Sequence, residues 1–275
     1  MTRLINYLTE EMPAIRSEQL TEQEAIDMIN KNCSKILEQY KKHPSWYIYR
    51  GLKLSPNYQF TNPAKAQPRR SLGDIGNYYT LLMDNLPNWK KYPKRSRSLI
   101  CSRDINAAKG YGDAYVVFPY NNATFGVCPE LDIWISFLGN ISNLRTFNRD
   151  LKKLLILTTH GVKNFDKDWN RLTKSFKMSE ERIKNNLIPN DTINNFKLSF
   201  KQWIIEILNG KTYIETFKKY MDPNKNNFDL TKDPTTITQR RELWTDSKCV
   251  LVYHQLVDEV FLDKYEHDEK DDEGI

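Results

Sequence analysis

The chain has 275 residues, of which 39% are hydrophobic and 12% aromatic; this composition excludes a largely disordered protein and provides for a sizeable buried core. No apolar run reaches the roughly 18 residues of a membrane span, and residues 1–19 lack the basic-then-apolar plan of a signal peptide, so we expect a cytoplasmic protein. The formal net charge of +6 combines −7 over residues 258–275 with +13 over residues 1–257, and a basic body of this kind favours an anionic partner.

The first part of the chain predicts a helix, a strand and a loop. Residues 17–44 have apolar side chains at helical intervals, and Thr21 and Glu24 have the spacing of a capping box, so we expect one long amphipathic helix that Pro44 ends. Residues 46–51 are aromatic and branched, which indicates a strand. Residues 54–76 contain three prolines and are interpreted as a loop.

The middle of the chain is rich in strands. Residues 77–87 favour a helix that ends at a proline, and residues 105–112 favour a short helix that ends at a glycine. Strands are predicted for four apolar segments. These are 96–102, 114–120, 123–129 and 131–137.

From residue 143 to residue 221 the pattern turns helical, in five segments that begin near 143, 166, 179, 192 and 212. Asn209 and Gly210 mark the end of the fourth segment. A polar loop follows, and strand character returns between 240 and 256. We therefore predict a single α+β domain over 1–257 with a helical insertion at about 143–221, and an acidic, solvated C-terminal tail over 258–275.

The cysteines and histidines give no metal or redox motif. Cys33, Cys101, Cys128 and Cys249 include no CxxC pair, which is typical of reduced thiols, and no two histidines have ligand spacing. Cys128 is interpreted as a buried core thiol. No phosphate-binding glycine motif of the P-loop or Rossmann type is present.

Three segments place polar groups beside apolar strands. Arg50 ends an aromatic strand and is followed by Gly51, where a guanidinium could bind a phosphate or carboxylate, or could simply face water. Ser102 ends a strand before a short helix. Glu242 precedes the last strand, either as a salt-bridged surface acid or as a catalytic acid.

A basic run, KKYPKRSR, precedes the second segment. It contains a tyrosine, and basic residues interleaved with an aromatic suit contact with nucleic acid, although a solvated charge run is the alternative. The candidate residues for an anionic partner are Lys90, Lys91, Lys94, Arg95 and Arg97.

In this order the three segments resemble the R-S-E pattern of ADP-ribosyltransferases. The resemblance covers about residues 46–126 and 235–255, and some segments are also similar to bacteriophage proteins. It implies an ADP-ribosyltransferase-like mixed sheet and an NAD⁺-dependent enzyme that modifies a protein or nucleic acid. It also implies that Arg50 and Gly51 bind the diphosphate region of NAD⁺, that Ser102 and Tyr111 shape the nicotinamide pocket, and that Glu242 is catalytic.

The sequence departs from that family in two places. Its Ser-Thr-Ser triplet is replaced by either Cys101-Ser102-Arg103 or Ser96-Arg97-Ser98. Arg240 stands where many members that modify arginine carry a second glutamate, which disfavours arginine as the acceptor. The alternative functions are hydrolysis of NAD⁺ at the same site, and a non-catalytic viral protein that binds nucleic acid or a partner through a basic face.

Overall fold

A computed structural model describes residues 17–53, 55–68, 77–137, 141, 144–159, 164–185, 196, 198–237 and 240–262. Within them the fold is α+β, as predicted, and is built on one nine-stranded sheet of order β1-β3-β9-β5-β2-β4-β8-β6-β7. All the strand pairs described in this sheet are antiparallel, so the mixed sheet that the resemblance implies is not found. The strands are β1 (Glu18–Gln19), β2 (Tyr49–Leu52), β3 (Tyr58–Thr61), β4 (Leu99–Ser102), β5 (Asp113–Pro119), β6 (Phe125–Val127), β7 (Asp229–Thr231), β8 (Glu242–Thr245) and β9 (Cys249–Tyr253).

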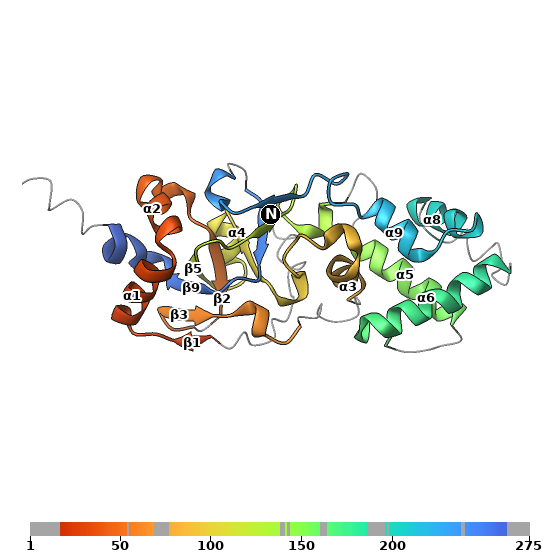
Figure 1. Cartoon of the computed structure of the whole chain (residues 1–275), viewed down its shortest axis with the longest axis horizontal. Helices are drawn as coiled ribbons and strands as arrows, with labels where there is room; N and C mark the ends of the chain where they lie inside the picture. Colours follow the sequence, from red (N-terminus) through yellow and green to blue (C-terminus); the bar gives the residue numbers. More distant parts are fainter. Residues whose placement is uncertain are drawn as a thin grey trace, which may run out of the picture.

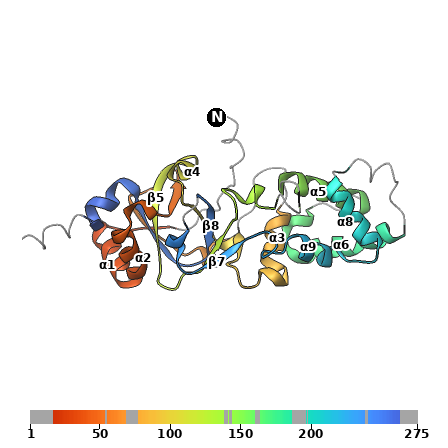
Figure 2. The same ribbon diagram turned by 90° about the horizontal axis from the view of Figure 1, so that it is seen from above.

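The molecule is elongated, with the sheet at one end and a group of helices at the other (Figure 1). The helices are α1 (Glu22–Asn32), α2 (Ser34–Lys42), α3 (Tyr78–Asn85), α4 (Ile105–Lys109), α5 (Leu144–Thr158), α6 (Trp169–Lys184), α8 (Leu198–Leu208) and α9 (Tyr213–Tyr220). Figure 2, seen from above, shows the same arrangement, with α3 between the sheet and the helical group α5, α6, α8 and α9.

Because successive side chains of a strand point to opposite faces of the sheet, the buried side chains belong to separate cores on the two faces. In β5, Val116 and Phe118 pack with α1 and α2 on one face of the sheet, whereas Tyr115 and Val117 pack on the other face with residues of β4, β6 and β8. A third and larger core joins the helical group to the sheet. It contains Trp244 of β8 together with buried side chains of α3, α5, α6, α8 and α9.

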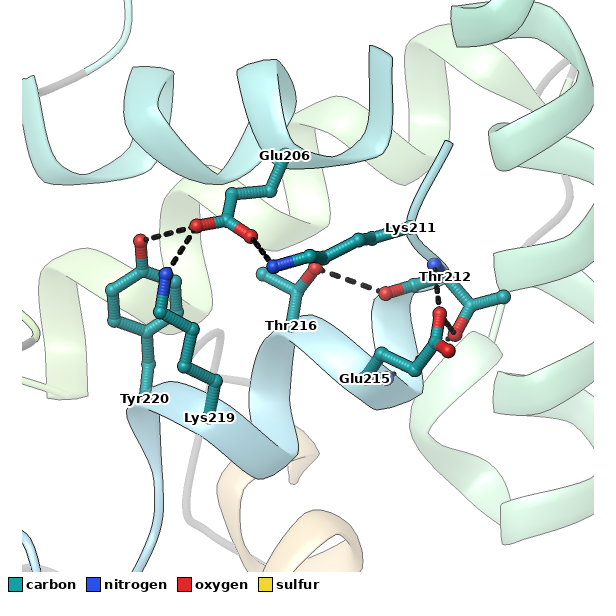
Figure 3. Close-up of polar contacts among 7 residues, drawn as sticks. All are labelled: Glu206, Lys211, Thr212, Glu215, Thr216, Lys219 and Tyr220. Carbon is teal, nitrogen blue, oxygen red and sulfur yellow. Dashed lines mark hydrogen bonds and ion pairs between the residues drawn. The ribbon is translucent and has the colours of Figure 1, made fainter. Parts of the chain in front are cut away.

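Polar contacts tie α8 to α9 within the helical group (Figure 3). The carboxylate of Glu206 on α8 accepts hydrogen bonds from Lys211 at 2.6 Å, from Lys219, and from the hydroxyl of Tyr220 at 3.1 Å. Thr212 begins α9 with a capping box closed by Glu215. These contacts fix the two helices against each other at the edge of their apolar core.

The long N-terminal helix predicted from the sequence is two helices. Its capping box between Thr21 and Glu24 is confirmed, but the helix breaks at Cys33, whose thiol is buried and donates to the carbonyl of Phe118 at 3.3 Å. Asn121 satisfies the backbone at the break: its N–H donates to the carbonyl of Asn32 at 2.6 Å, and its side chain accepts from the N–H of Lys35 at 3.1 Å. A partner distant in sequence therefore makes the break possible.

Three assignments in loops and strands were wrong. β3 lies in the proline-containing segment predicted as a loop, because it pairs with β9 from Tyr58 to Thr61. The short strand β7 lies in the polar loop after α9 and pairs with β6. The segment 131–137 is a 3₁₀ turn and not a strand, because the side chain of Asp132 accepts from the N–H of Trp134 at 3.0 Å.

Other boundaries differ from the prediction. The helices expected near 166 and 179 are the single helix α6, in which Ser179 is buried and bonded to the hydroxyls of Thr158 and Tyr213. The strand expected from residue 46 begins at Tyr49, after a 3₁₀ turn over Pro44–Trp46. The tail begins with a π-helical turn over Asp258–Leu262 that buries Phe261, and residues 263–275 lie outside the described residues.

Candidate functional site

The strand register brings the three sequence segments together. β4 lies between β2 and β8, with Ser102 opposite Tyr49 on one side and opposite Glu242 on the other. Arg50 follows Tyr49 directly on β2. Arg50, Ser102 and Glu242, which are up to 192 positions apart in the sequence, therefore lie on three adjacent strands at one level of the sheet.

The short helix α4 adds Tyr111 to this level. The N–H of Asp104 donates to the hydroxyl of Ser102 at 3.0 Å, and the Asp104 carboxylate caps α4 by accepting from the N–H of Asn106 at 2.9 Å. Gly51 allows α4 to approach β2, because a Cβ atom there would lie 1.9 Å from the carbonyl oxygen of Ala108. Tyr111 follows at the end of the helix and its N–H donates to the same carbonyl.

These elements surround a pocket of about 220 Å³. All five residues predicted for the site line it, so the structure brings the whole predicted set together. The lining is Tyr49, Arg50, Gly51, Ile100, Cys101, Ser102, Asp104, Asn106, Ala107, Ala108, Gly110, Tyr111, Leu131, Asp132 and Glu242. Their roles in binding or catalysis stay predictions.

Arg50 is held by the walls of the pocket. It is buried, its Nη1 donates to the carbonyl of Ile100 at 2.7 Å, and its guanidinium carbon lies 5.4 Å from the centre of the Tyr111 ring. The guanidinium therefore has a fixed orientation beside an aromatic ring. The prediction that Arg50 could face water as an ordinary edge-strand arginine was wrong.

Glu242 is buried, lines the pocket, and has three hydrogen-bond donors around its carboxylate. Arg95 Nη2 lies 2.6 Å from Oε1, the N–H of Ile133 lies 3.4 Å from Oε2, and the thiol of Cys128 lies 3.7 Å from Oε1. The alternative of a salt-bridged surface acid is thus right about the ion pair and wrong about the surface.

The prediction from the sequence that Arg95 belongs to an exposed basic face was wrong. The residue is 2% exposed and lies in the 3₁₀ turn Arg95–Arg97, with its guanidinium 5.4 Å from the Trp244 ring and paired with Glu242. A basic run gives no sign of this burial, because the partner lies 147 positions away. The other members of the run, Lys90, Lys91, Lys94 and Arg97, are exposed.

The structure distinguishes the two segments that could supply the serine of the R-S-E pattern. Ser102 lines the pocket, whereas Ser96 and Ser98 lie in and just after the 3₁₀ turn that carries Arg95 and do not line it. Arg240 is exposed and lies 3.4 Å from the carboxylate of Asp104 at the pocket edge. The pocket also contains Leu131 and Asp132, which the sequence did not single out because their segment was predicted as a strand.

Cys128 is a buried core thiol, as predicted. Burial raises its pKa well above the ordinary value, and the carboxylate of Glu242 acts in the same direction. The thiol is therefore protonated at neutral pH and serves as a weak hydrogen-bond donor to Glu242.

No protein-family model, curated protein or solved structure matches this chain. In the part of the chain that the structure describes, no helix is long and apolar enough to cross a membrane. The same residues contain no group of three or more His, Cys, Asp or Glu side chains placed to hold a metal ion. The interpretation of the site therefore depends on its own geometry.

Proposed function

We propose that the protein is an NAD⁺-dependent ADP-ribosyltransferase that modifies a protein or nucleic acid. The observation that carries the proposal is the register Tyr49–Ser102–Glu242 across β2, β4 and β8, which surrounds one pocket with every residue that the R-S-E resemblance implies. The strands taken one by one do not require these residues to lie together, because each segment could occupy any place in a nine-stranded sheet.

The reaction breaks the bond between C1′ of the ribose and the nicotinamide nitrogen. The electron pair of that bond leaves with nicotinamide, which becomes neutral, and positive charge develops on the ribose as in glycoside cleavage. A nucleophilic atom of the acceptor then forms a bond to C1′ and loses its proton to solvent or a base. The protein has to stabilise the ribose cation and hold the leaving group and the diphosphate.

The pocket residues suit these tasks. Glu242 supplies a preorganised carboxylate for the ribose cation and its hydroxyl groups. Arg50 supplies a fixed guanidinium for the diphosphate, and Tyr111 supplies an aromatic surface for nicotinamide. Water in place of the acceptor would give hydrolysis of NAD⁺ at the same site.

A non-catalytic basic binding face is less well supported. The cluster proposed from the sequence loses Arg95 to the interior, and the four cations that stay exposed have no pocket in common with Glu242 or Arg50. Binding of an anionic partner at this surface stays a separate prediction.

Transfer is tested with NAD⁺ labelled in the adenine ring, incubated with cell lysate and the purified protein. We expect label in macromolecules with the wild type and a loss of about 10²–10³-fold with Glu242→Gln, by analogy with other preorganised groups. Glu206→Gln is the matched control, since Glu206 is a paired glutamate in the helical group, far from the pocket lining. Digestion with protease or nuclease identifies the acceptor class, and equal labelling by the wild type and Glu242→Gln would contradict the proposal.

A further inference from the structure

The buried pair of Arg95 and Glu242 lies where the main pocket continues into a small recess. Glu242 lines the main pocket, but Arg95 does not. Arg95 lines the adjoining recess of about 20 Å³, which shares Arg50, Tyr111 and Glu242 with the pocket. The arginine therefore contacts the glutamate from the recess and not from the larger pocket.

The side chain of Arg95 is fixed independently of any ligand. It is 2% exposed and its guanidinium packs against Trp244, whose indole N–H donates to the carbonyl of Pro93 at 2.9 Å. The adjacent backbone is also held, since the N–H of Ser96 donates to Asp84 at 3.3 Å. A guanidinium in such a setting is a permanent positive charge in a fixed place.

The effect on Glu242 is both orientational and electrostatic. At 2.6 Å the Arg95 Nη2 determines where Oε1 points, and the N–H of Ile133 determines the position of Oε2. The cation is also the ion-pair partner of this buried carboxylate, and a neutral side chain in its place would leave the carboxylate without that partner. Cys128 cannot replace it, because its thiol carries no charge.

We propose that Arg95 is the positioning residue of the site, which holds the carboxylate of Glu242 by its ion pair and aims it into the pocket. That the carboxylate acts on a ribose cation rests on the proposed function. The control of its orientation does not, and it can be measured in the protein without NAD⁺.

The test is the ¹³C NMR chemical shift of the Glu242 carboxyl carbon at pH 7, in protein labelled with ¹³C at glutamate and assigned by the signal that disappears in Glu242→Gln. Removal of the ion pair in Arg95→Met is expected to move this signal away from its wild-type position. Arg95→Lys, which keeps a cation, is expected to move it less. If Arg95→Met does not fold, Arg95→Gln is the second neutral variant.

Separate measurement of kcat and KM for nicotinamide release links the pair to the reaction. In the neutral variant kcat should fall by about tenfold or more and recover in part in Arg95→Lys, with the affinity for NAD⁺ within about threefold of the wild type, since Arg95 does not line the larger pocket. An unchanged Glu242 signal in the neutral variants would overturn the inference. Absence of nicotinamide release by the wild type, with a displaced signal in the variant, would instead overturn the proposed function alone.

Discussion

Gly51 shows how one missing side chain shapes the site. It lies on β2 between Arg50 and the turn that carries Tyr111, and α4 packs directly over it. We expect Gly51→Ala to lower the free energy of unfolding by about 1–3 kcal/mol, because the added Cβ would overlap a backbone carbonyl that cannot move without α4. NAD⁺ affinity should fall as well, since Tyr111 moves with the helix. Urea unfolding and a binding titration measure the two effects.

Gly110→Ala is the control for this prediction. A Cβ at Gly110 would lie 3.3 Å from the carbonyl of Ala107, and the backbone there is ordinary helical, so a much smaller loss is expected. Equal losses for Gly51→Ala and Gly110→Ala would contradict the close packing of α4 on β2.

At the scale of elements, the contact between α8 and α9 depends on pH. Hydrogen bonds from Lys211 and Lys219 lower the pKa of Glu206 from 4.5 to about 2. A carboxyl group whose pKa is depressed in the folded state contributes stability above its unfolded pKa and loses it as the pH falls through the folded one. The contribution of Glu206 should therefore be complete above about pH 5 and disappear towards pH 2.

Glu206→Gln tests this contribution. Because both lysines are nearly half exposed, solvent screens the pairs and we expect a loss of at most about 1 kcal/mol at pH 7. The difference between wild type and variant should shrink as the pH falls below about 4, measured by urea unfolding at each pH. A difference that grows in acid would contradict the assignment.

At the scale of the whole molecule, one apolar core joins the helical group to the sheet. Trp244 and Cys128 pack in the same cluster as residues of α5, α6, α8 and α9. We therefore expect a single calorimetric transition, with equal calorimetric and van't Hoff enthalpies, rather than separate melting of sheet and helices. Two resolved transitions would show that residues 144–220 fold as a unit of their own and would contradict the prediction of one domain.

Local patterns predicted much of this architecture. The capping box at Thr21, the end of α8 at Gly210 and the strand β5 follow from spacing and turn chemistry over a few residues, and the structure has them. Features that depend on distant partners could not be predicted in this way. The break at Cys33 needs Asn121, and the strand β3 needs β9.

The same distinction holds for the site. Arg50, Ser102 and Glu242 each lie beside an apolar strand, and their order along the chain carries the resemblance from which the site was predicted. Arg95 was assigned to the surface because it stands in a run of cations, and only the fold shows that it is the buried partner of Glu242. Leu131 and Asp132 line the pocket because they precede a 3₁₀ turn, whereas the apolar pattern of their segment predicted a strand.

The measurement that tests the central claim most directly is the release of nicotinamide from NAD⁺ by the purified protein, with and without lysate, alongside Glu242→Gln and Glu206→Gln. The account predicts release by the wild type and by Glu206→Gln, and a decrease of about 10²–10³-fold for Glu242→Gln. Stimulation by lysate would identify transfer rather than hydrolysis. If the wild type released no nicotinamide under either condition and did not bind NAD⁺, the assignment of this pocket would be contradicted.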